Sequence, residues 1–357
     1  MSEGGGRRPD PAFWNGKRVL LTGHTGFKGS WAAVWLHRMG ALATGLALAP
    51  DQTPSLFELA GVGELIESHI LDVRDRAAVA DLVGSRDWDL VIHMAAQPIV
   101  RASVEDPVGT FGANVMGVAH LLDALRGQRP QAVLVVTSDK VYANEETARA
   151  FAEADALGGK DPYSASKAAA EIVTASYART FFARSGVPVA TGRAGNVIGG
   201  GDFSRDRLIS DIVRAARAGT ALELRHPEAT RPWQHVLDCV AGYLVYAETL
   251  AQDPAAPRAV NFGPAEGAPV TVGALADTAL KAFGVDRPWR HTPDPASVEA
   301  RHLSIDTTLA RRALGFSSRL DGGQAVAMTM DWYRDQARGA DPRRLTLDQI
   351  ALYESLP

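Results

Sequence analysis

The sequence predicts an α/β protein built on a doubly wound parallel sheet, with a smaller C-terminal lobe interleaved with it. From Arg18 onward, short apolar runs alternate with amphipathic stretches, the pattern of parallel strands that are joined by helices on both faces. Six such runs precede Arg193, which suits one doubly wound sheet. After Arg193 the alternation gives way to a glycine-rich run, Gly199 to Asp202, and to mixed elements up to Arg231. This change of pattern indicates the second lobe.

The individual elements follow in chain order. The apolar run 18–22 leads into a glycine-rich turn and is the first strand, and the stretch 27–39 after that turn is the first helix. Later apolar runs of strand length lie close to Gly, Pro or Asp, and helical stretches fill the intervals. Further strands are expected at 42–48, 68–71, 90–93, 132–137 and 188–191, and the main helices at 108–125 and 163–184. A late strand is expected at 260–262. The segment of about 259–263 that contains it returns to the main sheet.

These elements divide the chain into three parts. Residues 1–13 carry several Gly and Arg and no apolar stretch, so we expect a flexible N-terminal tail. Residues 14–195 form the main domain, together with the returning strand. Residues 196–357 form mainly the smaller lobe.

Composition excludes several classes of protein. The net charge of -4 offers no basic surface, so we expect neither a nucleic-acid partner nor an anionic membrane. No apolar run is expected to reach the length of a membrane span. With one cysteine, Cys239, the chain forms no internal disulfide, and we expect a cytoplasmic protein. The histidines show no metal-ligand spacing, so no metal site is predicted.

A glycine-rich loop between the first strand and the first helix predicts a Rossmann-type dinucleotide site. Gly23 would allow the tight turn, Gly26 the close approach of a pyrophosphate, and Gly29 the packing of helix against strand. The helix N-terminus would then direct its free N–H groups toward the phosphates. Lys28 would either contact phosphate or lie on the surface.

The spacing of the loop leaves the choice between NAD and NADP open. The glycines follow Gly-x-x-Gly-x-x-Gly, and no acidic residue ends the second strand, where one is expected to hold the ribose hydroxyls. Asp72, after the third strand, would either accept from the adenine amino group or cap the next helix.

A catalytic constellation follows further along the chain. Tyr163 and Lys167 are four residues apart on a predicted helix and therefore share one face. An ammonium beside a phenol lowers the phenol's pKa and makes it a competent general base. Ser138, Asp139 and Lys140 follow the strand 132–137, where ligands bind in open α/β sheets. Ser138 would donate to a substrate oxygen beside the phenol, and the next two residues would add an acid and an amine.

With these residues the chain resembles the extended short-chain dehydrogenase/reductases, and among them the CDP-glucose 4,6-dehydratases. The resemblance runs from Trp14 nearly to the C-terminus. It lies in the segments 22–30, 93–98, 137–142, 158–167, 193–202, 231–236 and 331–333. It implies a tightly held NAD, a nucleotide-sugar substrate in the smaller lobe, and homodimers or homotetramers assembled through helices of the main domain.

The resemblance also implies roles for individual residues. Tyr163 and Lys167 would contact the cofactor as well as act in catalysis. The other implied NAD-binding residues are Gly23, His24, Gly26, Phe27, Lys28, Gly29, Asp72, Val73, Ala95, Ala96, Asn114 and Thr137. The implied substrate-binding residues are Gln97, Ser103, Asn196, Arg207, Leu222, Leu224, Arg231 and Arg301. The arginines would bind phosphate oxygens through paired donors.

The implied reaction converts CDP-D-glucose to CDP-4-keto-6-deoxy-D-glucose for deoxysugar biosynthesis. Tyr163 would take the proton of the sugar 4-hydroxyl, oriented by Ser138, while hydride passes from C4 to NAD. A base then removes the C5 proton, an acid protonates the departing 6-hydroxyl, and hydride returns to C6. Asp139 is the implied acid and Lys140 the implied base, although Asp139 could also serve both steps.

Two alternatives stay open from the sequence. The first is an epimerase, or a dehydratase acting on another nucleotide sugar. The acid and amine at 139 and 140 favour elimination, because 4-epimerisation needs only that hydride leave and return. The second is a non-catalytic, dinucleotide-sensing protein, which the complete set of Ser138, Tyr163 and Lys167 disfavours.

Overall fold

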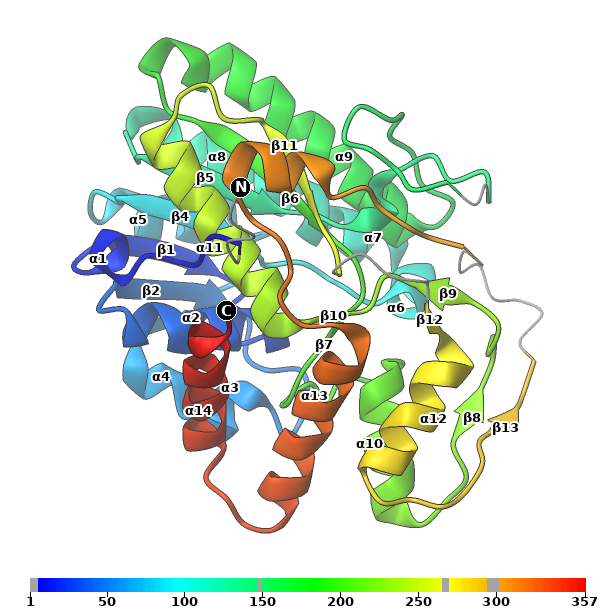
Figure 1. Cartoon of the computed structure of the whole chain (residues 1–357). Coiled ribbons are helices and arrows are strands. Elements are labelled where there is room, and N and C mark those ends of the chain that lie inside the picture. Colours follow the sequence, from blue (N-terminus) through cyan, green and yellow to red (C-terminus); the bar gives the residue numbers. More distant parts are fainter. Residues whose placement is uncertain (1–5, 147–148, 265–269, 294–301) are drawn as a thin grey trace.

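Seven parallel strands form the central sheet, in the order β11-β6-β5-β4-β1-β2-β3 (Figure 1). The computed structural model describes residues 6–146, 149–264, 270–293 and 302–357. The strands are β1 (Arg18–Thr22), β2 (Leu42–Ala47), β3 (Glu67–Ile70), β4 (Leu90–His93), β5 (Ala132–Val136), β6 (Val189–Ala194) and β11 (Ala259–Phe262). The doubly wound fold is therefore confirmed, and β11 returns to the sheet beside β6.

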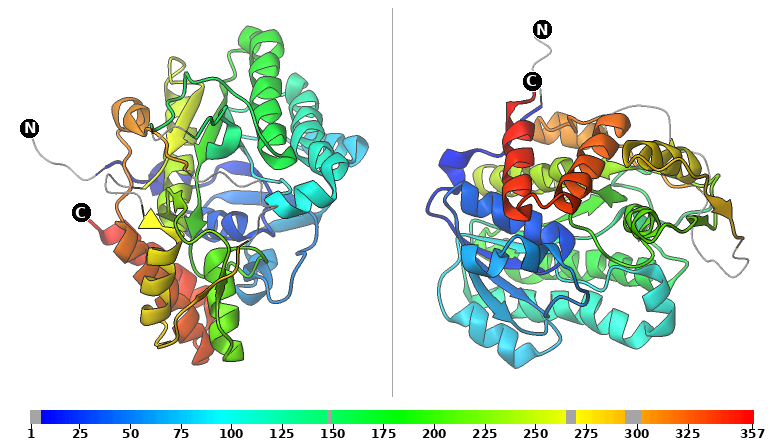
Figure 2. Two further views of the ribbon diagram at one scale, coloured as in Figure 1. Left: turned by 90° about the vertical axis from the view of Figure 1, so that its right-hand side faces the viewer. Right: turned by 90° about the horizontal axis from the view of Figure 1, so that it is seen from below.

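Helices cover both faces of the sheet, which explains why its strands are apolar almost throughout (Figure 2). One face carries α2 (Phe27–Arg38) and α11 (Val236–Gln252), with α14 (Pro342–Ser355) packed on α2 and α13 (Gly322–Ala337) packed on α14. The other face carries α5 (Arg76–Gly84), α8 (Gly117–Ala124) and α9 (Pro162–Tyr177). All five residues of β5 are buried, so the polar residues that directly follow this strand leave a part of the sheet from which water is excluded.

The helical segment 107–127 is continuous but irregular. It consists of α7 (Pro107–Phe111), the π-helical turn η1 (Gly112–Met116), α8 and the 3₁₀ turn η2 (Leu125–Gly127). Among the described residues, this segment is long and apolar enough to cross a membrane by length and composition, although no such run was expected from the sequence. Core helices pass the same test, and α8 packs against α5 and α9.

The smaller lobe lies beyond the carboxyl ends of the central strands (Figure 1). It contains β7 (Val197–Ile198), α10 (Leu208–Ala218), β8 (Glu223–Leu224), β9 (Thr230–Arg231), β10 (Gln234–His235), β12 (Val270–Thr271), α12 (Val272–Ala282) and β13 (Arg290–His291). These strands pair as three two-stranded sheets, and α12 packs between α10 and α13. Because α11, β11 and α14 pack with the central sheet and its helices, the two lobes are interleaved in sequence.

Short helices complete the structure. They are α1 (Pro11–Trp14), α3 (Leu56–Leu59), α4 (Val62–Leu65), α6 (Val100–Glu105), η3 (Asp139–Val141), η4 (Ala178–Phe182), η5 (Ala183–Ser185) and η6 (Ala310–Leu314). The expected helix 163–184 thus runs as α9, η4 and η5.

The N-terminal segment is docked from residue 6 onward, where a flexible tail was expected over 1–13. Arg7 forms an ion pair of 2.9 Å with the buried Glu248, and Trp14 donates to the same carboxylate at 2.7 Å. Arg8 donates to backbone carbonyls near the C-terminus. Buried charge therefore ties this segment to α11.

Candidate active site

The candidate site lies where the strand order reverses. From β1 the chain builds β2 and β3 on one side and then crosses to β4 on the other, so the loops after β1 and β4 separate at the carboxyl edge. A Cβ on Gly23 would lie 2.7 Å from the backbone nitrogen of Ala95. The two loops are therefore in direct contact.

The glycines of the first loop are required by its geometry. Gly23 has a φ of +78°, which only glycine adopts readily. A Cβ on Gly29 would lie 2.0 Å from the carbonyl oxygen of Gly23, so any side chain there would separate helix from strand. Gly26 is exposed and caps α2 without a side-chain hydrogen bond, which leaves the first N–H groups of the helix available. This cradle fits a dinucleotide pyrophosphate.

Two neighbours of this loop have structural contacts. His24 is buried, its Nε2 lies 2.7 Å from the Ser68 hydroxyl, and burial lowers its pKa to about 4. Asp72 accepts from the Arg74 side chain at 2.6 to 3.0 Å. The cap of α5 is Asp75, so the alternative that made Asp72 the cap is wrong.

Other implied cofactor residues lie in the loop after β4 or on elements near the phosphate loop. Val73 is buried against Gly117, whose added Cβ would lie 2.8 Å from it. Ala95 donates its backbone N–H to Thr22, and Ala96 follows it, half-buried. Phe27 lies in the first turn of α2, close to Gly199 of the second lobe.

Asn114, in the π-helical turn, holds this loop to α9. It accepts from the Gln97 N–H at 2.8 Å and donates to the Ser166 hydroxyl at 2.8 Å. The Gln97 side chain donates to the Thr110 hydroxyl on α7 and accepts from the N–H of Ile99 in its own loop. Gln97 thus supports the wall of the site, where it was expected to line the sugar.

Ser103 has a similar supporting contact. Its hydroxyl accepts from the Tyr163 N–H at 3.1 Å and donates to the Val100 carbonyl at 2.6 Å, and its side chain is fully buried. It was expected to line the sugar, but its hydroxyl caps the first turn of α9. Ser103 therefore positions the helix that carries Tyr163.

The acid and amine lie at the end of β5, in η3. Ser138 caps this turn, because its hydroxyl accepts from the Lys140 N–H at 3.2 Å and donates to Asp139 Oδ1 at 3.1 Å. Asp139 is 1 % exposed, and its Oδ2 has no hydrogen-bond partner among the described residues. Burial raises the pKa of this carboxyl, although the charges of Lys140 and Arg231 oppose the rise. Asp139 is thus arranged to hold a proton, as an acid must.

Tyr163 lies in the first turn of α9, which begins at Pro162 because Asp161 caps it by accepting from the Ser164 N–H at 2.9 Å. Burial raises the pKa of the phenol, and the hydrogen bond with Ser138 and the charge of Arg207 act in the opposite direction. A lowered pKa was expected from Lys167; the shift is in the opposite direction, and burial is its largest cause. The structure brings Ser138 and Tyr163 together as predicted.

Lys167 follows Tyr163 by one helical turn and is buried. Its Nζ donates to the carbonyl of Val136, the last residue of β5, at 3.1 Å. Burial, with the nearby charge of Lys28, lowers the pKa of this amine to about 7. The amine therefore exchanges protons near neutral pH, which suits a proton-transfer site.

Lys28 is half-buried and does not lie free on the surface, one of the two positions expected from the sequence. Its Nζ lies 5.9 Å from the ring centroid of the buried Tyr243, and its charge acts on Asp139 and Lys167. The side chain thus turns inward, beneath the catalytic groups. Helix periodicity does not determine how a first-turn side chain is oriented, so the sequence could not predict this inward turn.

Three of the implied substrate residues reach the site from the second lobe. Asn196 has an Oδ1 that is buried without a hydrogen-bond partner among the described residues. Arg207 donates to the Pro98 carbonyl at 3.3 Å and so bridges the two lobes. Arg231 is 6 % exposed, and its charge acts on Asp139. A polar group and two cations therefore face the acid and the phenol.

The other implied substrate residues are Leu222, Leu224 and Arg301. Leu222 and Leu224 are buried in the apolar core of the second lobe, beside β13. Arg301 lies outside the described residues. In the part of the chain that the structure describes, no group of three or more His, Cys, Asp or Glu is arranged to hold a metal ion.

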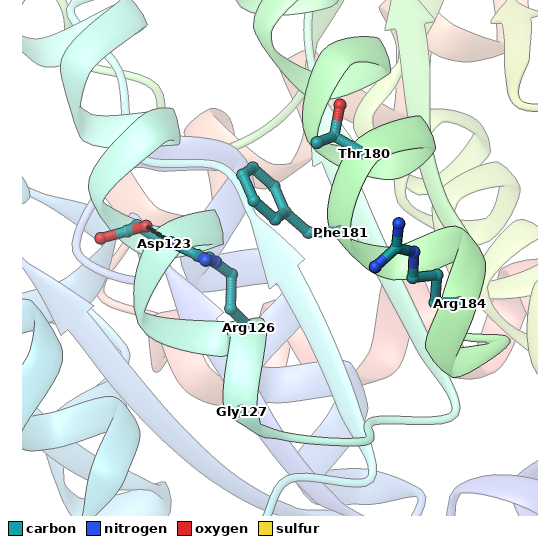
Figure 3. Close-up of a pocket in the computed structure, with 6 residues that line it drawn as sticks. All are labelled: Asp123, Arg126, Gly127, Thr180, Phe181 and Arg184. Carbon is teal, nitrogen blue, oxygen red and sulfur yellow. Dashed lines mark hydrogen bonds and ion pairs between the residues drawn. The ribbon is translucent and has the colours of Figure 1, made fainter.

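A surface pocket of about 360 Å³ lies elsewhere, at the amino edge of the sheet where η2 and η5 lead into β5 and β6 (Figure 3). Arg126 stacks over the Phe181 ring there, with 4.1 Å between guanidinium and ring centroid. Because catalytic groups gather at the opposite edge, this pocket is separate from the candidate site.

Two residues of the site, Gly195 and Glu171, were not predicted from the sequence. A Cβ on Gly195 would lie 2.8 Å from Asp139 Oδ2, so this glycine makes room for the acid. Glu171, one turn beyond Lys167 on the same helix face, forms a buried ion pair of 2.8 Å with Arg193. The spacing of 163, 167 and 171 was a signal that could have revealed Glu171.

Comparison with known proteins agrees with this geometry. The profile of the family described as "NAD dependent epimerase/dehydratase family" matches residues 19–263. A CDP-glucose 4,6-dehydratase from Salmonella typhimurium is 40% identical over 353 residues, which are 97% of this chain and 98% of that protein. A dTDP-glucose 4,6-dehydratase from Streptomyces antibioticus is 31% identical over 340 residues, or 91% of this chain and 94% of that protein.

Solved structures show the same fold at lower identity. A UDP-glucose 4-epimerase from Thermotoga maritima, solved with UDP-glucose, has a TM-score of 0.80 and 19% identity, covering 90% of this chain and 99% of its own. A UDP-glucuronic acid 4-epimerase from Bacillus cereus, solved with UDP-glucuronic acid and NAD, has a TM-score of 0.78 and 20% identity, with the same coverage.

Proposed function

We propose that this chain, which belongs to the NAD dependent epimerase/dehydratase family, dehydrates CDP-D-glucose to CDP-4-keto-6-deoxy-D-glucose. The observation that carries the proposal is the buried Asp139 beside Lys140, at the end of β5 and next to Tyr163. An oxidation at C4 requires only the phenol and its partners. The additional acid and amine are what elimination of water requires.

The first step depends on Tyr163 and Ser138. When bound, NAD supplies the hydride acceptor at C4 and the hydride donor at C6. Tyr163 takes the proton of the sugar 4-hydroxyl, and Ser138, hydrogen-bonded to the phenol, orients that oxygen. Lys167, whose amine exchanges protons near neutral pH, relays the proton away from the phenol.

The elimination step depends on the residues of η3. The 4-ketone acidifies the C5 proton, which Lys140 removes as base; the protonated amine then returns a proton to C5 as C6 receives hydride. Asp139 protonates the departing 6-hydroxyl, and burial, which raises the pKa of this carboxyl, favours the protonated form that this step needs. Arginine could not replace Lys140, because a guanidinium does not lose its proton in this pH range.

The nucleotide diphosphate is assigned to the second lobe. Arg231 and Arg207 supply guanidinium donors to the diphosphate oxygens, and the side-chain amide of Asn196 supplies a further N–H donor. Preference for cytidine rests on the similarity to the Salmonella typhimurium enzyme over nearly the whole chain. The proposed location is the cytoplasm, which fits the free, buried Cys239.

We also propose a homo-oligomer that assembles through α7, η1 and α9. Large apolar side chains are exposed there: Val108 is 81 % exposed, Met116 50 % and Ile172 61 %. Val104, Phe111 and Phe181 extend the same region. Apolar side chains in such number on neighbouring helices are typical of a protein–protein interface.

The test is incubation of the purified protein with CDP-, dTDP-, UDP- and GDP-glucose, with detection of water loss by mass spectrometry. The proposal expects turnover of the CDP sugar and little of the other three. A C4 epimer without loss of water would favour the epimerase alternative. Absence of both products would favour a dinucleotide-sensing protein.

A further inference from the structure

A buried polar network lies directly beneath the candidate catalytic groups. Its centre is the ion pair between Glu171 on α9 and Arg193 on β6, whose side chains are each 5 % exposed. Arg193 Nε and Nη2 donate to the two carboxylate oxygens at 3.0 and 2.8 Å, a bidentate arrangement. A dry ion pair of this kind adds little net stability, because removing two charges from water is costly. Stability therefore does not explain why this ion pair is buried here, and a role in positioning other groups is the alternative.

The carboxylate of Glu171 also holds the strands on which the site is built. Each of its oxygens accepts a second hydrogen bond, Oε1 from the Thr137 hydroxyl at 2.5 Å and Oε2 from the Thr191 hydroxyl at 2.7 Å. Thr137 is the residue immediately before Ser138. One turn earlier on α9, Lys167 donates to the carbonyl of Val136. Two consecutive turns of α9 are thus fixed to two consecutive residues at the end of β5.

Arg193 extends the network to the other end of η3. Its Nη1 donates to the Tyr142 hydroxyl at 2.9 Å, and that hydroxyl donates to Asn261 Oδ1 at 2.6 Å. Asn261, on β11, donates in turn to the carbonyls of Phe151 and Asp306 at 3.0 and 3.1 Å. The Tyr142 ring stacks on Phe151 with 5.0 Å between centroids. Tyr142 is therefore held by both a hydroxyl and a ring contact.

The network thus fixes both ends of the short segment that carries the acid and the amine. Thr137 precedes this segment and Tyr142 follows it, and both connect to the same ion pair. The helix that carries the phenol is connected to that ion pair through Glu171. Given the proposed function, we infer that Glu171, Arg193 and Tyr142 are positioning residues that set the acid and amine of η3 against Tyr163.

The chemistry predicts which of the two steps, oxidation or elimination, is slowed more when this network is loosened. Oxidation needs Tyr163 and Ser138, which also contact each other directly. Elimination needs Asp139 and Lys140 at two further atoms of the same ring, and a small misplacement of catalytic groups can cost about 100-fold in rate. Loosening of Tyr142 should therefore slow elimination more than oxidation. Reduced cofactor would then accumulate.

The test is Tyr142→Phe, which removes the hydroxyl and keeps the ring stacked on Phe151. The matched control is Tyr353→Phe, since Tyr353 is also buried and donates to Asp238 Oδ1 at 2.9 Å, but lies on α14, away from η3. Each variant loses one buried hydroxyl, which makes two hydrogen bonds at Tyr142 and one at Tyr353, so a larger thermal shift is expected for Tyr142→Phe. NADH absorbance in single turnovers measures oxidation, and mass detection of the 4-keto product measures elimination.

We expect Tyr142→Phe to oxidise the sugar within about twofold of wild type and to eliminate water at least about tenfold more slowly. Tyr353→Phe should perform both steps as wild type does. Equal losses in both steps, or elimination at the wild-type rate, would overturn the inference. If Tyr142→Phe does not fold, Thr191→Val, which removes a hydroxyl from Glu171 but preserves shape, should show the same split. A wild-type protein that fails to dehydrate the CDP sugar would instead overturn the proposed function.

Discussion

Replacing Gly195 by alanine should impair the acid without straining the backbone. Gly195 does not have a positive φ, so alanine can adopt its conformation. The added Cβ would lie 2.8 Å from Asp139 Oδ2 and 2.6 Å from Pro232 Cγ. Since ordinary contact begins at about 3.5 Å, the carboxyl must move by roughly 0.7 Å. Because about 1 Å of misplacement can cost about 100-fold, we expect elimination to slow by roughly ten- to thirtyfold.

The assay is a single turnover of CDP-glucose at saturating concentration, which removes any effect of Pro232 and the adjacent Arg231 on binding. NADH formation should stay within about threefold of wild type, while release of water slows. Gly84→Ala is the control, because its Cβ meets nothing within 4 Å. Elimination by Gly195→Ala at the rate of the control would show that Asp139 does not act from this position.

Three further predictions address other residues. Lys140→Met should reduce the cofactor but form no dehydrated product, and normal product formation would exclude Lys140 as the base. Lys167→Met should be more stable than wild type at pH 7. The shift of the Lys167 pKa from the ordinary 10.5 to about 7 costs wild type roughly 4 kcal/mol at pH 7, because the unfolded chain binds more protons than the folded one between these two values. The variant leaves the Val136 carbonyl without its donor, which offsets about 1 to 3 kcal/mol, so a net gain on the order of 2 kcal/mol is expected. The free energy of unfolding of wild type therefore rises with pH between these two values. Urea unfolding at pH 7 and pH 9 should show that the stability difference between Lys167→Met and wild type is smaller at pH 9. An equal difference at both pH values would argue against a depressed pKa of Lys167. Val108→Asp should shift the protein to smaller species in sedimentation velocity, and an unchanged distribution would place the interface elsewhere.

The strands and the phosphate loop could be predicted because local patterns determine them. Buried parallel strands are continuous apolar runs, and β1 has the bounds that its pattern indicated. Gly23 and Gly29 were informative because backbone geometry leaves no alternative to glycine there. The end of β6 was placed too early, since Gly192 and Arg193 interrupt the apolar pattern within the strand.

The candidate site was predicted only in part, because burial and side-chain direction depend on contacts distant in sequence. The pairing of Ser138 with Tyr163 followed from strand ends and helix spacing. The inward turn of Lys28 and the engagement of Gln97 by Thr110 depend on elements that the pattern does not orient. The raised pKa of Tyr163 reflects burial, which a pair of residues four apart does not reveal.

The most direct measurement of C4 oxidation followed by elimination uses CDP-glucose labelled with deuterium at C4. The proposed mechanism predicts a 4-keto-6-deoxy product that carries this deuterium at C6 and one solvent hydrogen at C5. Deuterium retained at C4 of an inverted sugar, or lost to solvent, would be incompatible with it.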